Sequence, residues 1–388
     1  GGFFVPNGNE KAAIFCILGK DGNGMGEMYH CPDCGRELRY QGLCWRCKAE
    51  QERREVLAWT PKQCQEKLAG LLANVERLDK APWEGDFQNL LHCHGICSPE
   101  LARAALAAEV YYPAELYYHA PADVRDGLVQ ALLETDNPMR AGNLLCCLAM
   151  QGDSRTLEVF RELEEHPRPW RKKLYVDPSV YAHTGGWTFD KAGQRRQLNF
   201  DTCYPLIKGD RSRDKAAQVF RPREERCPHC KGPVVDILTL DGRDERLRFL
   251  GLDGIITATC CPNCVPWEEP AWSRFTLDGR SEAVFPYTYG EGEESDGDWE
   301  AELSDNPYVL GPDPVPLFYG AEFDGLTCTV GGFPFWIQDA QYYPCPDCGK
   351  TMMYLAQIKW DALDFMEGTL YIEICPDCRT VSMHHQQT

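Results

Sequence analysis

The sequence contains no apolar run long enough to cross a membrane and no secretory leader pattern. A membrane-spanning helix needs about 20 mostly apolar residues. A leader combines a basic start, an apolar run and a small-residue cleavage site. Because both features are missing, we predict a cytoplasmic protein that has no membrane partner.

Basic side chains are scarce relative to acidic ones. The chain has 59 Asp and Glu residues against 40 Lys and Arg residues, which gives a formal net charge of −19. Contacts to phosphates need clustered Lys and Arg side chains, so this balance argues against nucleic acid as a partner. An acidic protein is better suited to bind a basic protein, although solubility alone also accounts for such a charge.

The segment 281–305 lacks Lys and Arg altogether and carries nine carboxylates. It is either a solvated loop or an acidic arm that contacts a basic partner. Under the second interpretation, the candidate partner-binding residues lie at its centre: Glu293, Glu294, Asp296, Asp298 and Glu300.

The sequence also lacks the motifs that commonly identify an enzyme. It has no P-loop, no dinucleotide fingerprint, no HExxH helix and no G-x-S-x-G turn. In the run from His92 to Cys97, His94 and Cys97 could share a helical face, but a helix end with a buried cysteine explains the run as well. His384 and His385 are expected to be exposed. We therefore predict no catalytic residues and no enzymatic activity.

Cysteine, in contrast, is abundant, with 21 residues. Twelve of them form six Cys-x-x-Cys pairs, which fall into three sets of two pairs. The sets are Cys31/Cys34 with Cys44/Cys47, Cys227/Cys230 with Cys261/Cys264, and Cys345/Cys348 with Cys375/Cys378. Two such turns separated by a loop form the ligand pattern of a four-thiolate zinc site. The sequence therefore predicts up to three Zn²⁺ ions.

A shell of four cysteines leaves no open coordination position, so these sites are expected to stabilise the fold rather than to catalyse a reaction. Zinc thiolates also favour a reducing compartment. The alternative is a disulfide-rich secreted protein, which the concentration of cysteines in paired turns of a long chain disfavours. Cys260 could compete with its neighbour Cys261 as a ligand, but the Cys-x-x-Cys spacing favours Cys261.

A chain of 388 residues is too long for one ordinary core. The predicted fold class is multidomain α+β, with a zinc hairpin at residues 28–58, a helical domain at 59–168 and a β-rich domain at 175–388. Residues 1–27 are interpreted as an extension that need not be native, because Met25 or Met28 could be the natural start.

Helix signals dominate residues 61–166. Pro61 stands at one helix start, and Ser98 with Pro99 marks another as N-cap and first helical residue. Further helices are predicted at 113–119, 122–135, 138–150 and 153–166. The last two resemble one unit of a HEAT-type solenoid, in which short helix pairs stack side by side. A plain helical bundle is the alternative.

Aromatic and β-branched residues become frequent after residue 181. Strands are predicted at 185–189, 234–240, 255–259, 315–319, 335–337, 354–358 and 370–374. The last two alternate in part between apolar and polar residues, as half-buried strands do. Because strands lead into and out of the Cys-x-x-Cys turns, we predict zinc ribbons at 227–264 and 345–378.

An ordered series of motifs occupies residues 330–388. It begins with Gly331-Gly332-x-Pro334-x-Trp336, continues with a Cys-Pro-x-Cys-Gly turn at Cys345 and a strand that carries Gln357, and closes with a second Cys-Pro-x-Cys turn at Cys375. With these motifs, residues 306–388 resemble the zinc-binding form of the YwqG-like family of bacterial proteins. More loosely, residues 177–305 resemble the other lobe of that family, with the ribbon at 227–264 as an insertion.

The resemblance implies a β-rich fold and a frequent place among the immunity proteins of bacterial polymorphic toxin systems. A related eukaryotic group acts as chaperones of ribosomal proteins. The leading hypothesis is therefore an immunity protein that binds a basic antibacterial toxin domain and blocks its active site or the access of its substrate. The alternative is a chaperone for a basic protein, for example a ribosomal protein.

Overall fold

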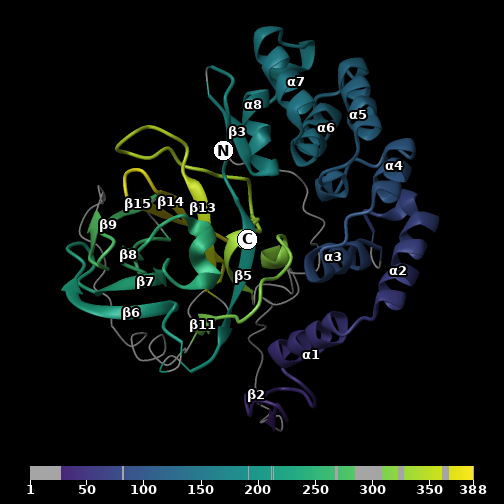
Figure 1. The fold of residues 1–388 in the computed structure, drawn as a ribbon. Coiled ribbons are helices and arrows are strands. Elements are labelled where there is room, and N and C mark those ends of the chain that lie inside the picture. The colour runs from purple at the N-terminus through teal and green to yellow at the C-terminus, as the bar shows by residue number, and fades with distance from the viewer. Residues whose placement is uncertain are drawn as a thin grey trace, which may run out of the picture.

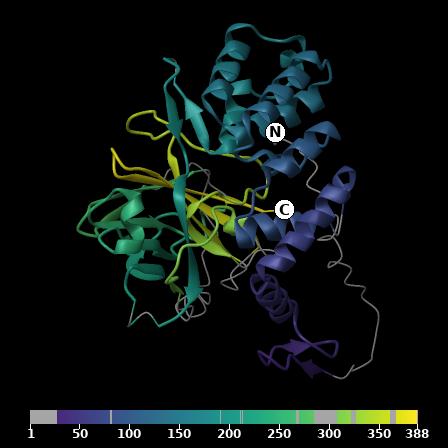
Figure 2. The same ribbon diagram turned by 45° about the vertical axis from the view of Figure 1, so that its right-hand side comes forward.

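The computed structural model describes residues 28–80, 83–190, 192–210, 212, 214–266, 270–284, 308–321, 327–360 and 367–387. It contains an N-terminal cysteine hairpin, a helical middle and a β-rich C-terminal part (Figures 1 and 2). The predicted α+β fold class is therefore confirmed. Among these residues, no helix combines the length and the apolar character that crossing a membrane requires.

The helices follow one another in a curved row along one side of the β-rich part (Figure 1). They are α1 (Trp45–Leu57), α2 (Pro61–Ala73), α3 (Trp83–His94), α4 (Pro99–Ala107), α5 (Ala122–Glu134), α6 (Pro138–Gln151), α7 (Ser154–Glu165) and α8 (Pro178–Tyr181). The start of α4 is as predicted, since Ser98 Oγ accepts a hydrogen bond from the Leu101 N–H at 3.1 Å. Whether the row is a solenoid or a bundle stays a prediction.

The helical middle also corrects two expectations. Helix α1 lies inside the segment predicted as a hairpin. Helix α3 lies in the segment predicted as helical and ends at His94 beside the buried Cys93, as expected for a helix end. Helix α1 escapes periodicity analysis because Val56 is its one buried residue, so the helix has no apolar stripe. The helix predicted at 113–119 is only a 3₁₀ turn at Ala114–Tyr117, and the backbone of His119 is left-handed, with φ 50°.

The β-rich part is built from one large and one small antiparallel sheet. The large sheet has the order β10-β9-β15-β14-β13-β12-β5-β11, and the small one has the order β6-β7-β8. The strands of these two sheets are β5 (Phe200–Lys208), β6 (Ala217–Arg226), β7 (Pro233–Asp241), β8 (Ile255–Cys260), β9 (Ala271–Phe275), β10 (Ser281–Val284), β11 (Tyr308–Leu310), β12 (Cys328–Gly332), β13 (Met353–Lys359), β14 (Thr369–Cys375) and β15 (Thr380–Gln386). Two short hairpins pair β1 (Tyr29–His30) with β2 (Glu37–Leu38) and β3 (Trp187–Phe189) with β4 (Arg195–Gln197).

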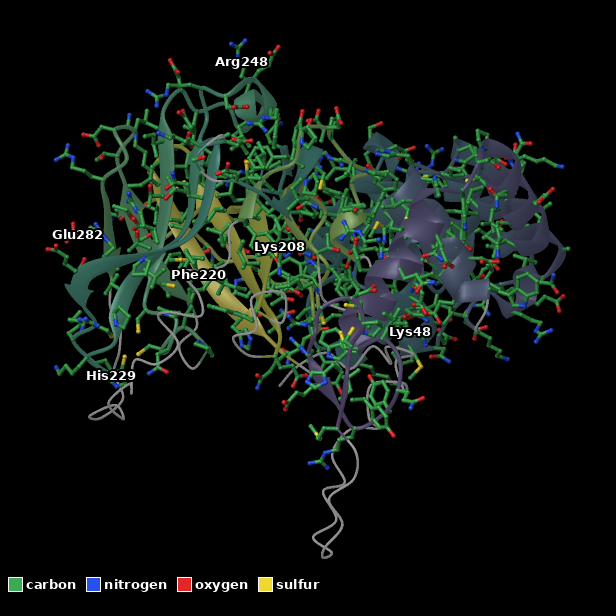
Figure 3. All side chains as sticks on the ribbon, turned by 90° about the horizontal axis from the view of Figure 1, so that it is seen from below. Lys48, Lys208, Phe220, His229, Arg248 and Glu282 are labelled. Atoms are coloured by element: carbon green, nitrogen blue, oxygen red, sulfur yellow. The ribbon has the colours of Figure 1, made fainter. Side chains whose placement is uncertain are left out.

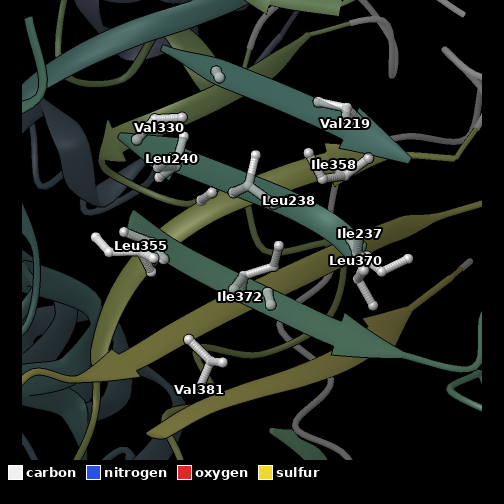
Figure 4. Close-up of a cluster of buried hydrophobic side chains, with 14 of the residues drawn as sticks. Val219, Ile237, Leu238, Leu240, Val330, Leu355, Ile358, Leu370, Ile372 and Val381 are labelled. Carbon is white, nitrogen blue, oxygen red and sulfur yellow. The ribbon is translucent and has the colours of Figure 1, made fainter. Parts of the chain in front are cut away.

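The two sheets pack face to face around one apolar core, shown in Figure 4. Val219 and Leu238 of the small sheet lie against Leu355, Ile358 and Ile372 of the large one. Each of these side chains is at most 2% exposed. The insertion between β5 and β9 therefore supplies the second layer of the sandwich, because it covers apolar surface that the large sheet would otherwise expose.

The opposite face of the large sheet is covered as well. Tyr354 and Tyr371 point away from the sandwich core and pack with Leu198, Trp336 and Tyr342. All seven residues of β14 and of β15 are buried. The expectation of half-buried strands at 354–358 and 370–374 was therefore wrong, because a second layer of loops excludes water from this face.

The predicted strands at 315–319 and 335–337 are not strands. Pro316 and Pro334 have no N–H to give to a ladder. Instead, the Phe335 N–H donates to Gln357 Oε1 at 2.9 Å and the Ile337 N–H donates to Tyr371 Oη at 3.0 Å. The segment 333–338 thus runs across the sheet as a loop whose backbone is satisfied by side chains of the strands beneath it.

The helical middle and the β-rich part share side-chain contacts. Phe318 and Phe333, which flank β12 in the chain, belong to the helical core together with Tyr118. The ring centroids of Phe318 and Phe333 lie 4.4 Å apart, and that of Tyr118 lies 4.9 Å from that of Phe318. The predicted domain boundaries stay predictions, but this apolar contact joins the two parts physically.

Candidate metal centres

The structure brings the twelve cysteines of the paired turns together in three groups of four. The first contains Cys31, Cys34, Cys44 and Cys47, the second Cys227, Cys230, Cys261 and Cys264, and the third Cys345, Cys348, Cys375 and Cys378. Within each group, the four sulfur atoms lie within 4.8 Å of one another. All cysteines in the described ranges are free thiols.

The spacing of the sulfur atoms fits a tetrahedral ion. With metal–sulfur bonds of about 2.3 Å, the edge of such a tetrahedron is about 3.8 Å. Observed Sγ–Sγ distances are 3.5 Å for Cys34 and Cys44, 3.8 Å for Cys227 and Cys264, and 3.7 Å for Cys348 and Cys375. Four thiolates at these distances suit a soft ion such as Zn²⁺ and complete its coordination shell.

Each group begins with a tight Cys-Pro-x-Cys turn. The Gly35 N–H donates to the Cys31 carbonyl at 2.8 Å, and the Gly349 N–H donates to the Cys345 carbonyl at the same distance. The residue after the second cysteine is left-handed in all three turns, with φ of 73° at Gly35, 62° at Lys231 and 71° at Gly349. This residue turns the chain back on itself, and glycine adopts the conformation without strain.

The second pair of cysteines lies at the start of a helix in the first group and at the end of a strand in the other two groups. Cys44 is the N-cap of α1 and Cys47 lies in its first turn, where the Cys47 N–H approaches Cys44 Sγ at 3.5 Å. Cys261 follows β8 directly, and Cys375 ends β14. In the first group, the positive end of α1 favours the thiolate form that a metal ion requires.

Hydrogen bonds also act on the acidity of the thiols. Burial raises the pKa of Cys31, but the Cys44 N–H at 3.3 Å from its sulfur and other backbone donors outweigh this and lower the pKa to about 6. Hydrogen bonds from the Cys261 and Cys264 thiols lower the pKa of Cys227 well below its usual range. In both clusters, hydrogen bonds therefore favour the thiolate, the form that binds metal.

The three groups differ in exposure. All four cysteines of the second group are buried, whereas Cys34 in the first group and Cys348 in the third are exposed. The second group also has a ring contact, since His229 Nδ1 lies 3.5 Å from Cys264 Sγ. Water and chelators therefore reach the first and third groups more easily than the second.

The other candidate ligands lie outside these groups. His94 ends α3, and its Nε2 lies 2.9 Å from the Val56 carbonyl oxygen, so it anchors α1. Cys97 is exposed, while Cys93 is buried. Cys260 is 2% exposed and belongs to the sandwich core rather than to the second group. The acidic candidates Glu293, Glu294, Asp296, Asp298 and Glu300 lie outside the described residues.

Sequence reasoning missed a buried polar layer on β14 and β15. Glu373 and His384 have no exposed surface, and His385 is 5% exposed, so the expected exposure of the two histidines was wrong. The His384 ring stacks on Tyr371 and Trp336, at centroid distances of 5.3 and 5.8 Å. Alternate polar residues on a strand normally indicate a face in water, so the sequence held no signal for this burial.

Sequence reasoning also missed a basic cleft of about 1090 Å³ beside the first cysteine group. Helix α1 forms one wall and the ends of β5 and β11 form the other. Figure 3 shows Lys208 of β5 between the β-rich part and the N-terminal helices, far from His229 and Glu282. The two walls are separated by more than 100 residues in the chain, so sequence proximity gave no indication of the cleft.

Comparisons with known proteins give one informative match. No family model matches this chain, and no solved structure matches it. A curated relative, the uncharacterized protein YpfL of Salmonella typhimurium (strain LT2), is 33% identical over 286 residues. The match covers 70% of this chain and 64% of that protein, so the chain spans somewhat less than two thirds of the relative.

Proposed function

We propose that each four-cysteine group binds one Zn²⁺ ion and that the ions serve the fold. The observation that supports this is the arrangement of four sulfur atoms within 4.8 Å in every group. Four soft ligands fill the tetrahedral shell, so no position remains for a substrate or an activated water. The first ion would stabilise the N-terminal hairpin, the second the turn between β6 and β7 together with the end of β8, and the third the end of β14. These segments lack large apolar cores of their own.

Zinc is expected to leave the three groups in two stages. A chelator should remove about two zinc ions quickly, from the groups that contain exposed Cys34 and Cys348, and the third slowly, from the buried second group. Release followed with a colorimetric zinc indicator measures the two phases. Release of all zinc in one fast phase would contradict the assignment of the slow ion to the buried group.

The function that we propose for the whole protein is immunity: tight binding of a basic antibacterial toxin domain, which blocks its active site or its substrate. Two features support this proposal. Closed metal sites are suited to structure rather than to catalysis, and the net charge of −19 favours fast association with a basic protein. The motifs of residues 330–388 that resemble the YwqG-like family direct the proposal to toxin immunity in particular.

Affinity purification from the organism that encodes the protein, followed by mass spectrometry, tests this function. We expect one stoichiometric protein partner, encoded beside this gene and toxic when expressed alone. A ribosomal or other housekeeping protein in its place would favour the chaperone alternative. Recovery of no protein partner would contradict both.

Replacing Cys345 and Cys348 by serine should abolish protection against the toxin in vivo, because the third group loses its metal and β14 loses its anchor. The matched control is Cys97→Ser, which changes an exposed thiol outside the three groups and should protect fully. Cell survival during toxin expression measures both variants. Full protection by the double variant would show that the third group is dispensable for the function.

A further inference from the structure

The basic cleft separates the first cysteine group from the end of the large sheet. Its volume of about 1090 Å³ lies just above the roughly 300–1,000 Å³ of small-molecule sites. Such a space is wide enough for an extended stretch of polypeptide. Helix α1, which forms one wall of the cleft, is held against the body of the protein by Arg53. The Arg53 side chain donates a hydrogen bond to Tyr319 Oη and lies 5.4 Å from the centre of that ring.

The charge of the cleft is opposite to that of the chain. Its cationic lining residues are Arg36, Arg46, Arg53, Arg54 and Lys208, against the two carboxylates of Asp33 and Glu50. Even with the double negative charge of a four-thiolate zinc centre beside it, this lining keeps an excess of positive charge. A concentration of cations in a protein of net charge −19 attracts negative groups to one place on its surface.

The chemistry of the lining indicates what kind of anion fits. Guanidinium groups bind carboxylates with two parallel hydrogen bonds, and they tolerate partial burial better than ammonium groups. Apolar side chains lie among the cations, namely Leu57, which is 43% exposed, and the half-buried Ile207. A ligand that alternates carboxylates with apolar side chains therefore matches both parts of this surface.

We propose that this cleft binds an acidic polypeptide segment of a partner protein, with its carboxylates on the arginines and its apolar side chains against Leu57 and Ile207. Nucleic acid fits less well. Single strands bind to exposed aromatic platforms, but the aromatic residue in this lining, Tyr308, is only 6% exposed. The net charge of the chain would also repel a long polyanion. Binding at this cleft does not require the immunity function proposed above, which draws on the net charge of the whole chain.

Selection of random dodecapeptides against the full-length, zinc-loaded protein tests the proposal. We expect the selected peptides to be rich in Asp and Glu, and their affinity to fall about tenfold or more in the double variant Arg46→Glu/Arg54→Glu. The matched control is Lys172→Glu/Lys173→Glu, which makes the same change in net charge at exposed residues of the helical part. It should bind the selected peptides as the native protein does.

Two further measurements make the result decisive. Zinc content and circular dichroism should be identical in both double variants, which separates loss of binding from loss of fold. Single-stranded oligothymidine serves as the competing probe. Three results would overturn the proposal. The selected peptides could be neutral or basic, or acidic peptides could bind both double variants equally. Alternatively, oligothymidine could bind through Arg46 and Arg54 while acidic peptides do not.

Discussion

Cys261→Ala is expected to remove one zinc ion from the protein and to prevent the sandwich from folding, whereas Cys260→Ala should do neither. The two neighbours are both buried, at 0% and 2% exposure, but only Cys261 lies in the second four-cysteine group. Structural zinc contributes on the order of 10–16 kcal/mol in small zinc domains. That is comparable to the whole stability of a typical domain, about 5–15 kcal/mol.

The cost of the neighbouring substitution is much smaller. Cys260 packs as a small apolar residue in the sandwich core, and its truncation to alanine removes a single sulfur atom at a cost of about 1–2 kcal/mol. Cys261 closes the metal site at the point where β8 of the small sheet ends. Loss of the ion there would release the turn between β6 and β7 and the end of β8 together.

Zinc per chain, measured by mass spectrometry of the metal, distinguishes the two variants. We expect three ions in Cys260→Ala and at most two in Cys261→Ala. If Cys261→Ala is insoluble, its soluble yield relative to Cys260→Ala gives the same contrast. Three ions in Cys261→Ala, or two in Cys260→Ala, would show that the second group is assigned to the wrong residue.

The second large effect concerns Glu373, whose replacement by glutamine should remove a loss of stability that accumulates between pH 4.5 and about 8. Glu373 is completely buried on β14, and burial raises the pKa of its carboxyl from 4.5 to about 8. Its Oε2 accepts hydrogen bonds from the Tyr343 N–H and from Ser382 Oγ, each at 3.0 Å. No group in the described residues donates to its Oε1. The site therefore suits a neutral carboxyl better than a charged one.

The sign of the pH dependence follows from where the proton is held. Between pH 4.5 and about 8, folded Glu373 keeps its proton while the unfolded chain releases it. Stability therefore falls as pH rises through this window, by about 1.4 kcal/mol per unit, or roughly 3 kcal/mol from pH 5.5 to 8. Glutamine has no proton to lose, so this contribution disappears in the variant.

Buried histidines act in the opposite direction at lower pH. Burial lowers the pKa of His384 to about 3 and that of His92 and His183 to about 4. Below pH 6.5 the unfolded chain binds protons that these folded rings refuse, so stability falls as pH decreases towards 4. Together with Glu373, these groups predict a stability maximum on the slightly acidic side of neutral.

Chemical unfolding in the presence of zinc, at a series of pH values from 5.5 to 8, measures the effect of Glu373→Gln. Between pH 5.5 and pH 8, the stability of the variant relative to that of the native protein should rise by roughly 3 kcal/mol. The matched control is Glu282→Gln, an exposed carboxyl on β10 of the same sheet, whose curve should run parallel to that of the native protein. A parallel curve for Glu373→Gln would contradict the burial of an uncharged carboxyl.

Features that depend on a few neighbouring residues could be predicted from the sequence. The three cysteine groups follow from spacing, because two residues between cysteines suffice to bring two sulfur atoms to one ion. The starts of α2, α4, α6 and α7 follow from proline at the first helical position or from a side chain that caps the first turn. The strands β7, β8, β13 and β14 follow from their β-branched and aromatic residues.

Features that depend on distant segments were decided only by the tertiary structure. Glu373 and His384 lie on a face that alternation assigns to water, but Trp336 and Tyr342 cover that face from a loop that was predicted to contain a strand. The cleft needs Arg46 of α1 and Lys208 of β5 on opposite walls, which no local pattern brings together. The sequence by itself determined the metal ligands, because their geometry is local. Burial and charge at a given point were decided by the tertiary structure, because both depend on which distant segments lie against that point.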